Sequence, residues 1–86
     1  LTLTTNYNIE ETSKNSKGQV ETYRSIITTQ LSIKKNNKIL KSNNFINEFS
    51  YNKKDNKYEL TKYQNEIKNN LINELSEEII LFLKLL

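Results

Sequence analysis

The stretch Leu60–Leu86, LTKYQNEIKNNLINELSEEIILFLKLL, decides the fold of this chain. Its apolar side chains recur every three or four residues, at Leu60, Tyr63, Ile67, Leu71, Leu75, Ile79, Phe82 and Leu86. Residues at that spacing share one face of a helix, because an α-helix has about 3.6 residues per turn. The pattern therefore predicts one long C-terminal helix with a single face to bury.

Capping residues predict where this helix begins. The candidates are Asp55, Asn56, and a capping box formed by Thr61 and Gln64. The predicted start therefore lies anywhere from Lys57 to Thr61. No glycine or proline follows, so we expect the helix to reach the chain end, with roughly 26 residues and a length near 40 Å. Lys84 then lies in the last turn, where a cation is favourable against the helix dipole.

The residues before the helix alternate with period two, which predicts three strands with one buried face each. In residues 1–10 the expected inner side chains are Leu1, Leu3, Thr5, Tyr7 and Ile9. In residues 20–35 they are Tyr23, Ser25, Ile27, Thr29, Leu31 and Ile33. In residues 38–52 they are Ile39, Phe45, Phe49 and Tyr51. We expect the strand tyrosines to lie at the core margin, with hydroxyls that reach water or a partner.

Polar segments predict the connections between these elements. Glu11–Gln19 holds Gly18 and is predicted to be a long hairpin loop. Asn36-Asn37 is predicted to be a two-residue turn, because asparagine tolerates positive φ better than other non-glycine residues. The weak alternation around Asn43-Asn44 suggests a β-bulge there.

These elements predict an α+β fold in the order β-β-β-α: a two-layer sandwich in which one long helix covers a three-stranded antiparallel meander. With 86 residues the chain is a single domain. It begins at a leucine and contains no methionine. We therefore expect it to be a piece of a longer protein.

Composition argues against catalysis and metal binding. The chain has no cysteine and no histidine, so it lacks a thiol nucleophile, the commonest general base and the commonest metal ligands. Glu74, Glu77 and Glu78 are interpreted as a solvated helix face. We predict no catalytic residue, no metal site and no cofactor. The net charge of +3 is mild and does not identify a partner.

The last turns of the helix are apolar on every side. A helix of this kind is normally buried all round, and three strands cannot cover it. The side chains expected to need a further partner are Ile80, Leu81, Leu83 and Leu85. Either an upstream segment of the same protein or a separate partner covers them, and we favour the upstream segment.

Lys53, Lys54 and Lys57 precede the helix. A basic helix entry after three strands is similar to the double-stranded-RNA-binding domain, whose motif has the form Lys-Lys-x-Ala-Lys. This chain has Lys-Lys-Asp-Asn-Lys instead, followed by Tyr58, so we favour a solvated turn.

Several short motifs resemble the LPS-assembly lipoprotein family, LptE. They are Asn6-Tyr7-Asn8-Ile9, Tyr23-Arg24, Phe49-Ser50-Tyr51-Asn52, Tyr58-Glu59-Leu60 with Tyr63, Ile67–Leu71 and Glu78–Leu83. The resemblance implies a non-enzymatic outer-membrane lipoprotein domain that faces the periplasm. It also implies binding to the β-barrel LptD, assistance in lipopolysaccharide assembly, and contact with lipopolysaccharide. It further implies that this chain is the C-terminal part of a longer mature protein and lacks an N-terminal strand and helix.

Lipopolysaccharide carries phosphates, which lysine and arginine bind as cations. The expected contacts are Arg24, Lys34, Lys35, Lys38 and Lys41. Two alternatives stay open. One is a small nucleic-acid-binding module built on Lys53, Lys54 and Lys57, and the other is a structural interaction domain that presents an edge strand or the apolar helix end.

Overall fold

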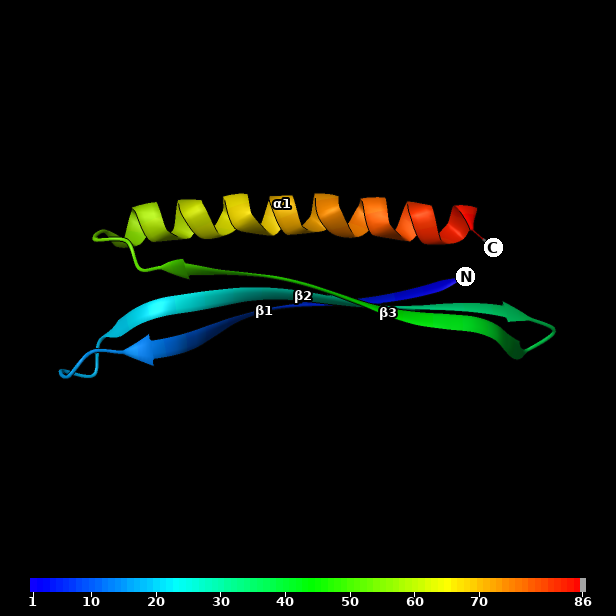
Figure 1. The fold of residues 1–86 in the computed structure, drawn as a ribbon, viewed down its shortest axis with the longest axis horizontal. Helices are drawn as coiled ribbons and strands as arrows, with labels where there is room; N and C mark the ends of the chain where they lie inside the picture. Colours follow the sequence, from blue (N-terminus) through cyan, green and yellow to red (C-terminus); the bar gives the residue numbers. More distant parts are fainter. Residues whose placement is uncertain (86) are drawn as a thin grey trace.

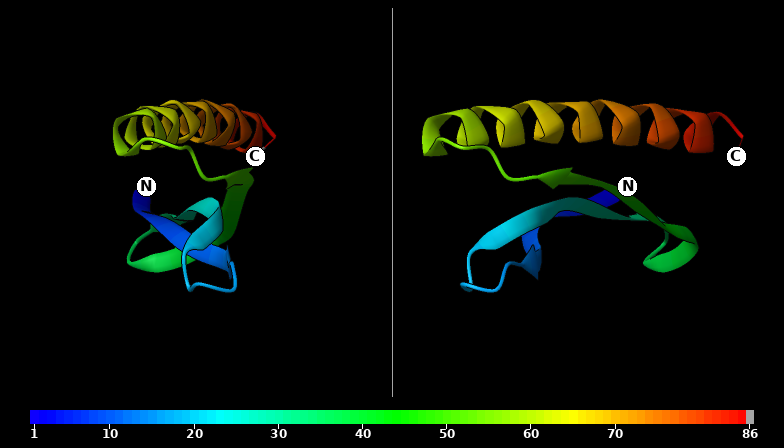
Figure 2. Two further views of the ribbon diagram at one scale, coloured as in Figure 1. Left: turned by 90° about the vertical axis from the view of Figure 1, so that its left-hand side faces the viewer. Right: turned by 60° about the vertical axis from the view of Figure 1, so that its left-hand side comes forward.

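The computed structural model describes residues 1–85, which form three strands and one helix: β1 (Thr2–Lys14), β2 (Val20–Lys35), β3 (Lys38–Asn52) and α1 (Lys57–Lys84). The strands form one antiparallel sheet in the order β1-β2-β3, and α1 lies along one face (Figure 1). The predicted α+β fold is therefore confirmed. The molecule is elongated, with Cα extents of 56 × 20 × 17 Å. End-on, the sheet twists strongly beneath the helix (Figure 2).

The β2–β3 connection is the predicted two-residue turn. Asn36 and Asn37 have φ of 54° and 64°, which is the left-handed conformation required at both central positions of a type I′ turn.

The β1–β2 loop is shorter than predicted. Residues 11–14 continue β1, with Lys14 opposite Val20, so only residues 15–19 form the loop. Cross-strand hydroxyl contacts extend the strand, because Thr12 and Ser13 each approach Thr22 Oγ1 to 2.6 Å. The polarity of residues 11–14 suggested a loop, but the hydroxyl groups of Thr12 and Ser13 contact that of Thr22 on the neighbouring strand.

The bulge predicted at Asn43-Asn44 is wrong. Both residues pair regularly with β2, and the register shift lies between Ile33 and Lys34. Ile33 pairs with Lys41 and Lys34 with Ile39, which leaves Leu40 as the extra residue. Because one extra residue reverses the alternation, Ile39 lies on the face opposite the one predicted and is 61% exposed.

Helix α1 begins at Lys57, within the predicted range. Asn56 caps it, since its side chain accepts a hydrogen bond of 3.1 Å from the Glu59 amide. The helix has 28 residues, which corresponds to about 42 Å. Lys84 lies in its last turn, as expected. Leu86, the last member of the predicted stripe, lies outside the described residues.

The core lies where the middle of α1 meets the sheet. Ile67, Leu71 and Leu75 are buried and cluster with Ile27 and Tyr51. Leu60, Tyr63 and Ile79 pack around this cluster, and Phe82 lies edge-on to Phe45 with ring centroids 5.7 Å apart. The predicted stripe is therefore confirmed for the described residues, and it is most deeply buried in the middle turns.

The predicted buried face of β1 is mostly open. Helix α1 packs on β3 and β2, and none of the β1 backbone described here lies close to it. Leu1, Leu3 and Ile9 are consequently 71%, 49% and 38% exposed. One helix covers about two strands, because helices pack 8–10 Å apart and strands about 4.8 Å apart. The sequence pattern identified the face of the sheet that the helix covers, but not that the helix covers only two of the three strands.

A hydroxyl network crosses the sheet beneath α1. Ser25 is fully buried, and its Oγ accepts a hydrogen bond of 3.0 Å from Tyr7 and lies 2.9 Å from the Tyr51 hydroxyl. The Tyr7 and Tyr51 hydroxyls therefore have a partner within the sheet. Tyr51 is only 6% exposed, so it lies in the core and not at the margin where it was expected. Without this network, the hydroxyl of Ser25 would be buried without a partner, which is costly.

The buried stripe predicts that Leu71→Ala destabilises the fold by about 2–5 kcal/mol, because it removes a core side chain and leaves a cavity. Its neighbour Ile72 is 38% exposed, so Ile72→Ala should change the unfolding free energy by under ~1 kcal/mol. Urea denaturation followed by circular dichroism compares the two variants. Equal losses would contradict the burial described here.

The hydroxyl network predicts energetic coupling between Ser25 and Tyr51. Ser25→Ala should cost roughly 1–3 kcal/mol, because it leaves the Tyr51 hydroxyl buried without this partner. Adding Tyr51→Phe should then cost about 1 kcal/mol less than it does in the wild type, since the orphaned hydroxyl is removed. A double-mutant cycle in urea measures the difference. Strict additivity would show that the two hydroxyls do not interact.

Candidate functional site

A basic tip forms at the β2–β3 turn from Lys34, Lys35, Lys38 and Lys41. All four are exposed, and the type I′ turn holds Lys35 directly opposite Lys38. Like charges facing each other across a hairpin are unfavourable. A bound anion would relieve this repulsion, so the geometry suits a phosphate or carboxylate.

The structure separates Arg24 from this basic tip. Arg24 lies ten positions before Lys34 on β2 (34 − 24 = 10), which is about 33 Å along an extended strand. Its guanidinium lies 3.9 Å from the Glu10 carboxylate. Arg24 and the tip lysines therefore cannot contact one phosphate group together.

Lys41 connects the basic tip to the end of α1. Its Nζ lies 5.2 Å from the Phe82 ring centroid, within cation–π range. Around Phe82, the last turns of α1 and its C-cap carry the predicted partner surface: Ile80, Leu81, Leu83 and Leu85, which are 51%, 60%, 36% and 86% exposed. The three strands leave these side chains uncovered, as expected. A cationic group and an apolar surface thus lie at the same end of the molecule.

The sheet face turned away from α1 is uncharged over half its length. Odd-numbered β2 residues face the helix, so even-numbered ones and their partners face away. Three consecutive cross-strand rows there are Thr2–Ser32–Ser42, Thr4–Gln30–Asn44 and Asn6–Thr28–Ile46. A hollow of about 310 Å³ lies along the last two rows. Sequence reasoning missed this surface, because each strand contributes only three of its residues.

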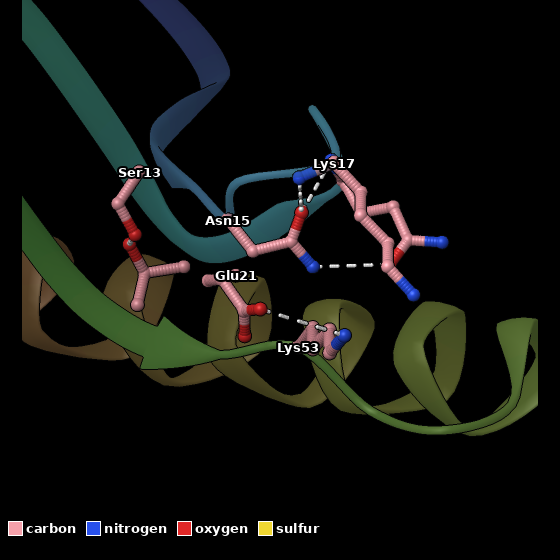
Figure 3. Close-up of polar contacts among 7 residues, drawn as sticks. Ser13, Asn15, Lys17, Glu21 and Lys53 are labelled. Atoms are coloured by element: carbon pink, nitrogen blue, oxygen red, sulfur yellow. Dashed lines mark hydrogen bonds and ion pairs between the residues drawn. The ribbon is translucent and has the colours of Figure 1, made fainter.

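The lysines before α1 are partly engaged within the chain. Lys53 Nζ lies 3.9 Å from the Glu21 carboxylate, and Lys54 Nζ lies 4.3 Å from the Tyr63 ring centroid. Figure 3 shows Lys53 pointing toward Glu21, near the β1–β2 loop. In that loop the Asn15 side chain accepts hydrogen bonds from the backbone amides of Lys17 and Gln19. Two of the three lysines proposed to grip nucleic acid therefore already have local partners.

Glu74, Glu77 and Glu78, the cluster noted in the sequence, do not converge on one site. Glu78 Oε1 accepts a hydrogen bond of 2.9 Å from Asn47 Nδ2 on β3, and Glu74 and Glu77 are exposed. In residues 1–85, no group of three or more acidic side chains is arranged to hold a metal ion. Glu78 thus has a structural role, in tying α1 to β3.

Over the same described range, α1 is not apolar enough along its length to serve as a membrane-spanning helix. Comparisons with protein-family models, with curated proteins and with solved structures found no significant match to this chain.

Proposed function

We propose that this chain is a non-enzymatic domain of the LptE type, which binds a β-barrel partner of the LptD type at the periplasmic side of the outer membrane and contacts lipopolysaccharide. The uncharged sheet face is the observation that carries the barrel half of the proposal. The basic tip supports the lipopolysaccharide half. Each half has its own experiment.

The uncharged face suits the inside of a barrel. The lumen of an outer-membrane barrel is lined by polar side chains, and threonine, serine, asparagine and glutamine offer it both hydrogen-bond donors and acceptors. The three rows from Thr2 to Ile46 contain no charged side chain. Such a face can lie against a polar wall without burying an unpaired charge, which would be costly.

The shape is also compatible with a lumen. The domain is a rod whose two shorter Cα extents are 20 and 17 Å, and wide barrels of about 22 strands hold plug domains. A rod of this width can enter lengthwise, with the basic tip leading or trailing.

The basic tip suits the phosphates of lipopolysaccharide, and the apolar helix end beside it suits acyl chains. Lys35 and Lys38 face each other across the turn, and Leu81 and Leu85 are exposed on the helix end. An amphiphilic ligand with anionic groups next to hydrocarbon matches this pairing of surfaces.

The basic tip predicts charge-dependent lipopolysaccharide binding. Lys35→Glu with Lys38→Glu should weaken the affinity by about tenfold, which corresponds to ~1.4 kcal/mol. The control is Lys14→Glu with Lys17→Glu, which makes the same charge change at the opposite hairpin and should leave affinity within about twofold. Fluorescence titration with purified lipopolysaccharide measures both variants. If both variants bind equally weakly, the affinity depends on net charge alone and not on the basic tip. If the wild type does not bind lipopolysaccharide, the ligand half of the proposal is wrong.

The uncharged face predicts a second outcome. Thr28→Arg with Gln30→Arg places two charges on that face and should abolish co-purification with the barrel protein, because charges buried against a polar neutral wall lack partners. The control, Asn65→Arg with Asn69→Arg, places the same two charges on the exposed side of α1. This variant should still co-purify with the barrel protein. Circular dichroism checks that both variants fold. Retention of the barrel by the first variant would contradict the proposed orientation.

A further inference from the structure

A groove lies between α1 and β3, on the side of the sheet that the helix covers. It has a volume of about 210 Å³, and its apolar floor is formed by Phe49, Tyr63, Ile67 and Leu71. Its remaining lining residues are Glu48, Glu66, Asn70 and Glu74. Glu66 and Glu74 bring two helix carboxylates to the groove, and no basic side chain lines it, in a chain whose net charge is +3. Glu48 pairs with Ile26, so its side chain faces away from α1.

The strand that borders this groove is a sheet edge. β3 pairs with β2 on one side and with no strand of residues 1–85 on the other. An open edge presents unpaired backbone N–H and C=O groups, which can pair with an added strand. The edge beside the groove carries Glu48 and Phe49, and Phe49 is 48% exposed.

The helix and an added strand would match in spacing. Glu66, Asn70 and Glu74 follow one another at four-residue intervals, which places them about 6 Å apart along α1. Alternate side chains of a strand are about 6.6–6.8 Å apart. Since α1 runs along β3 (Figure 1), alternate side chains of a strand added beyond β3 would lie opposite these three residues in turn.

We propose that this groove and the β3 edge bind an extended peptide with basic residues at positions i and i+4 and an apolar residue at i+2. The basic side chains pair with Glu66 and Glu74, and the apolar side chain enters the floor between them. The peptide backbone continues the sheet as a fourth strand. The proposal does not depend on the barrel or lipopolysaccharide proposals.

The size and chemistry of the groove fit this ligand. Pockets for whole small molecules usually have about 300–1,000 Å³, so 210 Å³ suits side chains of a peptide better. The ring of Tyr63, which forms part of the floor, can also accept a cation over its face: within the chain, Lys54 Nζ lies 4.3 Å from its centroid.

The matching peptide comes from another molecule. Among the cations of this chain, only two pairs lie four positions apart: Lys34 with Lys38, and Lys53 with Lys57. The residues midway are Asn36 and Asp55, and neither is apolar. A second copy of the chain therefore does not carry the required pattern, and we assign the groove to a different protein with a basic, strand-forming segment.

The test uses an acetylated heptapeptide, Thr-Lys-Thr-Val-Thr-Lys-Thr, titrated into the isotopically labelled chain at low salt and followed by NMR. Amide shifts should concentrate in residues 47–50 and 66–74. The rearranged peptide Thr-Thr-Lys-Lys-Val-Thr-Thr has the same composition without the alternation, so it should bind at least several-fold more weakly. Glu66→Gln with Glu74→Gln should weaken binding of the first peptide by roughly threefold to tenfold.

The matched control is Glu11→Gln with Glu59→Gln, which removes two exposed carboxylates elsewhere and should change the affinity by less than about twofold. Equal affinity for the two peptides, equal effects of the two double variants, or shifts outside the β3 edge would each overturn the proposal. Sedimentation of the chain alone is the remaining check. If the chain dimerises through the β3 edge, the same amide shifts should appear as the protein concentration rises. That result would assign the groove to a second copy of the chain and overturn the proposed foreign partner.

Discussion

The packing of Ile67, Leu71 and Leu75 onto Ile27 and Tyr51 is the interaction on which the rest of the structure depends. It is the main apolar contact between the two layers, and it is narrow. A single helix can cover only about two strands, so this contact decides which surfaces remain open. The outer part of β1 remains exposed because the helix lies over β2 and β3. In residues 1–85, the far face of the sheet, the outer edge of β3 and the last turns of α1 also lack a covering element. Each proposed binding surface is one of these uncovered regions or adjoins one.

Local features of the fold could be predicted from the sequence because their causes are local. Asn36-Asn37 determines a tight turn through its own backbone preferences, and Asn56 caps the helix through a bond to a residue three positions on. The helical stripe follows from periodicity within one segment. Features that depend on the pairing of distant segments could not be predicted. The extra residue Leu40 reverses the face of Ile39 only because of its register with β2. The Tyr7 hydroxyl reaches Ser25 only because the β1–β2 register places Ser25 opposite Ile9, diagonally across from Tyr7.

The same distinction explains the candidate sites. Lys34, Lys35, Lys38 and Lys41 surround one turn, so their proximity was evident from the sequence. Arg24 shares their charge but lies at the other end of the sheet, with Glu10 as its partner. The uncharged face and the groove between α1 and β3 are assembled from residues of different elements, such as Phe49 and Glu74 in the groove. Sequence patterns within a single element carry no information about such assemblies.

The most direct test of this account is the set of methyl–methyl nuclear Overhauser effects of the chain in solution. The methyl groups of Leu71 and Leu75 should show effects to those of Ile27 and none to those of Leu3, because α1 packs on β2 and β3 and leaves Leu3 uncovered. Effects between Leu71 and Leu3, or their absence between Leu71 and Ile27, would contradict the account. Either result would mean that the helix covers a different part of the sheet.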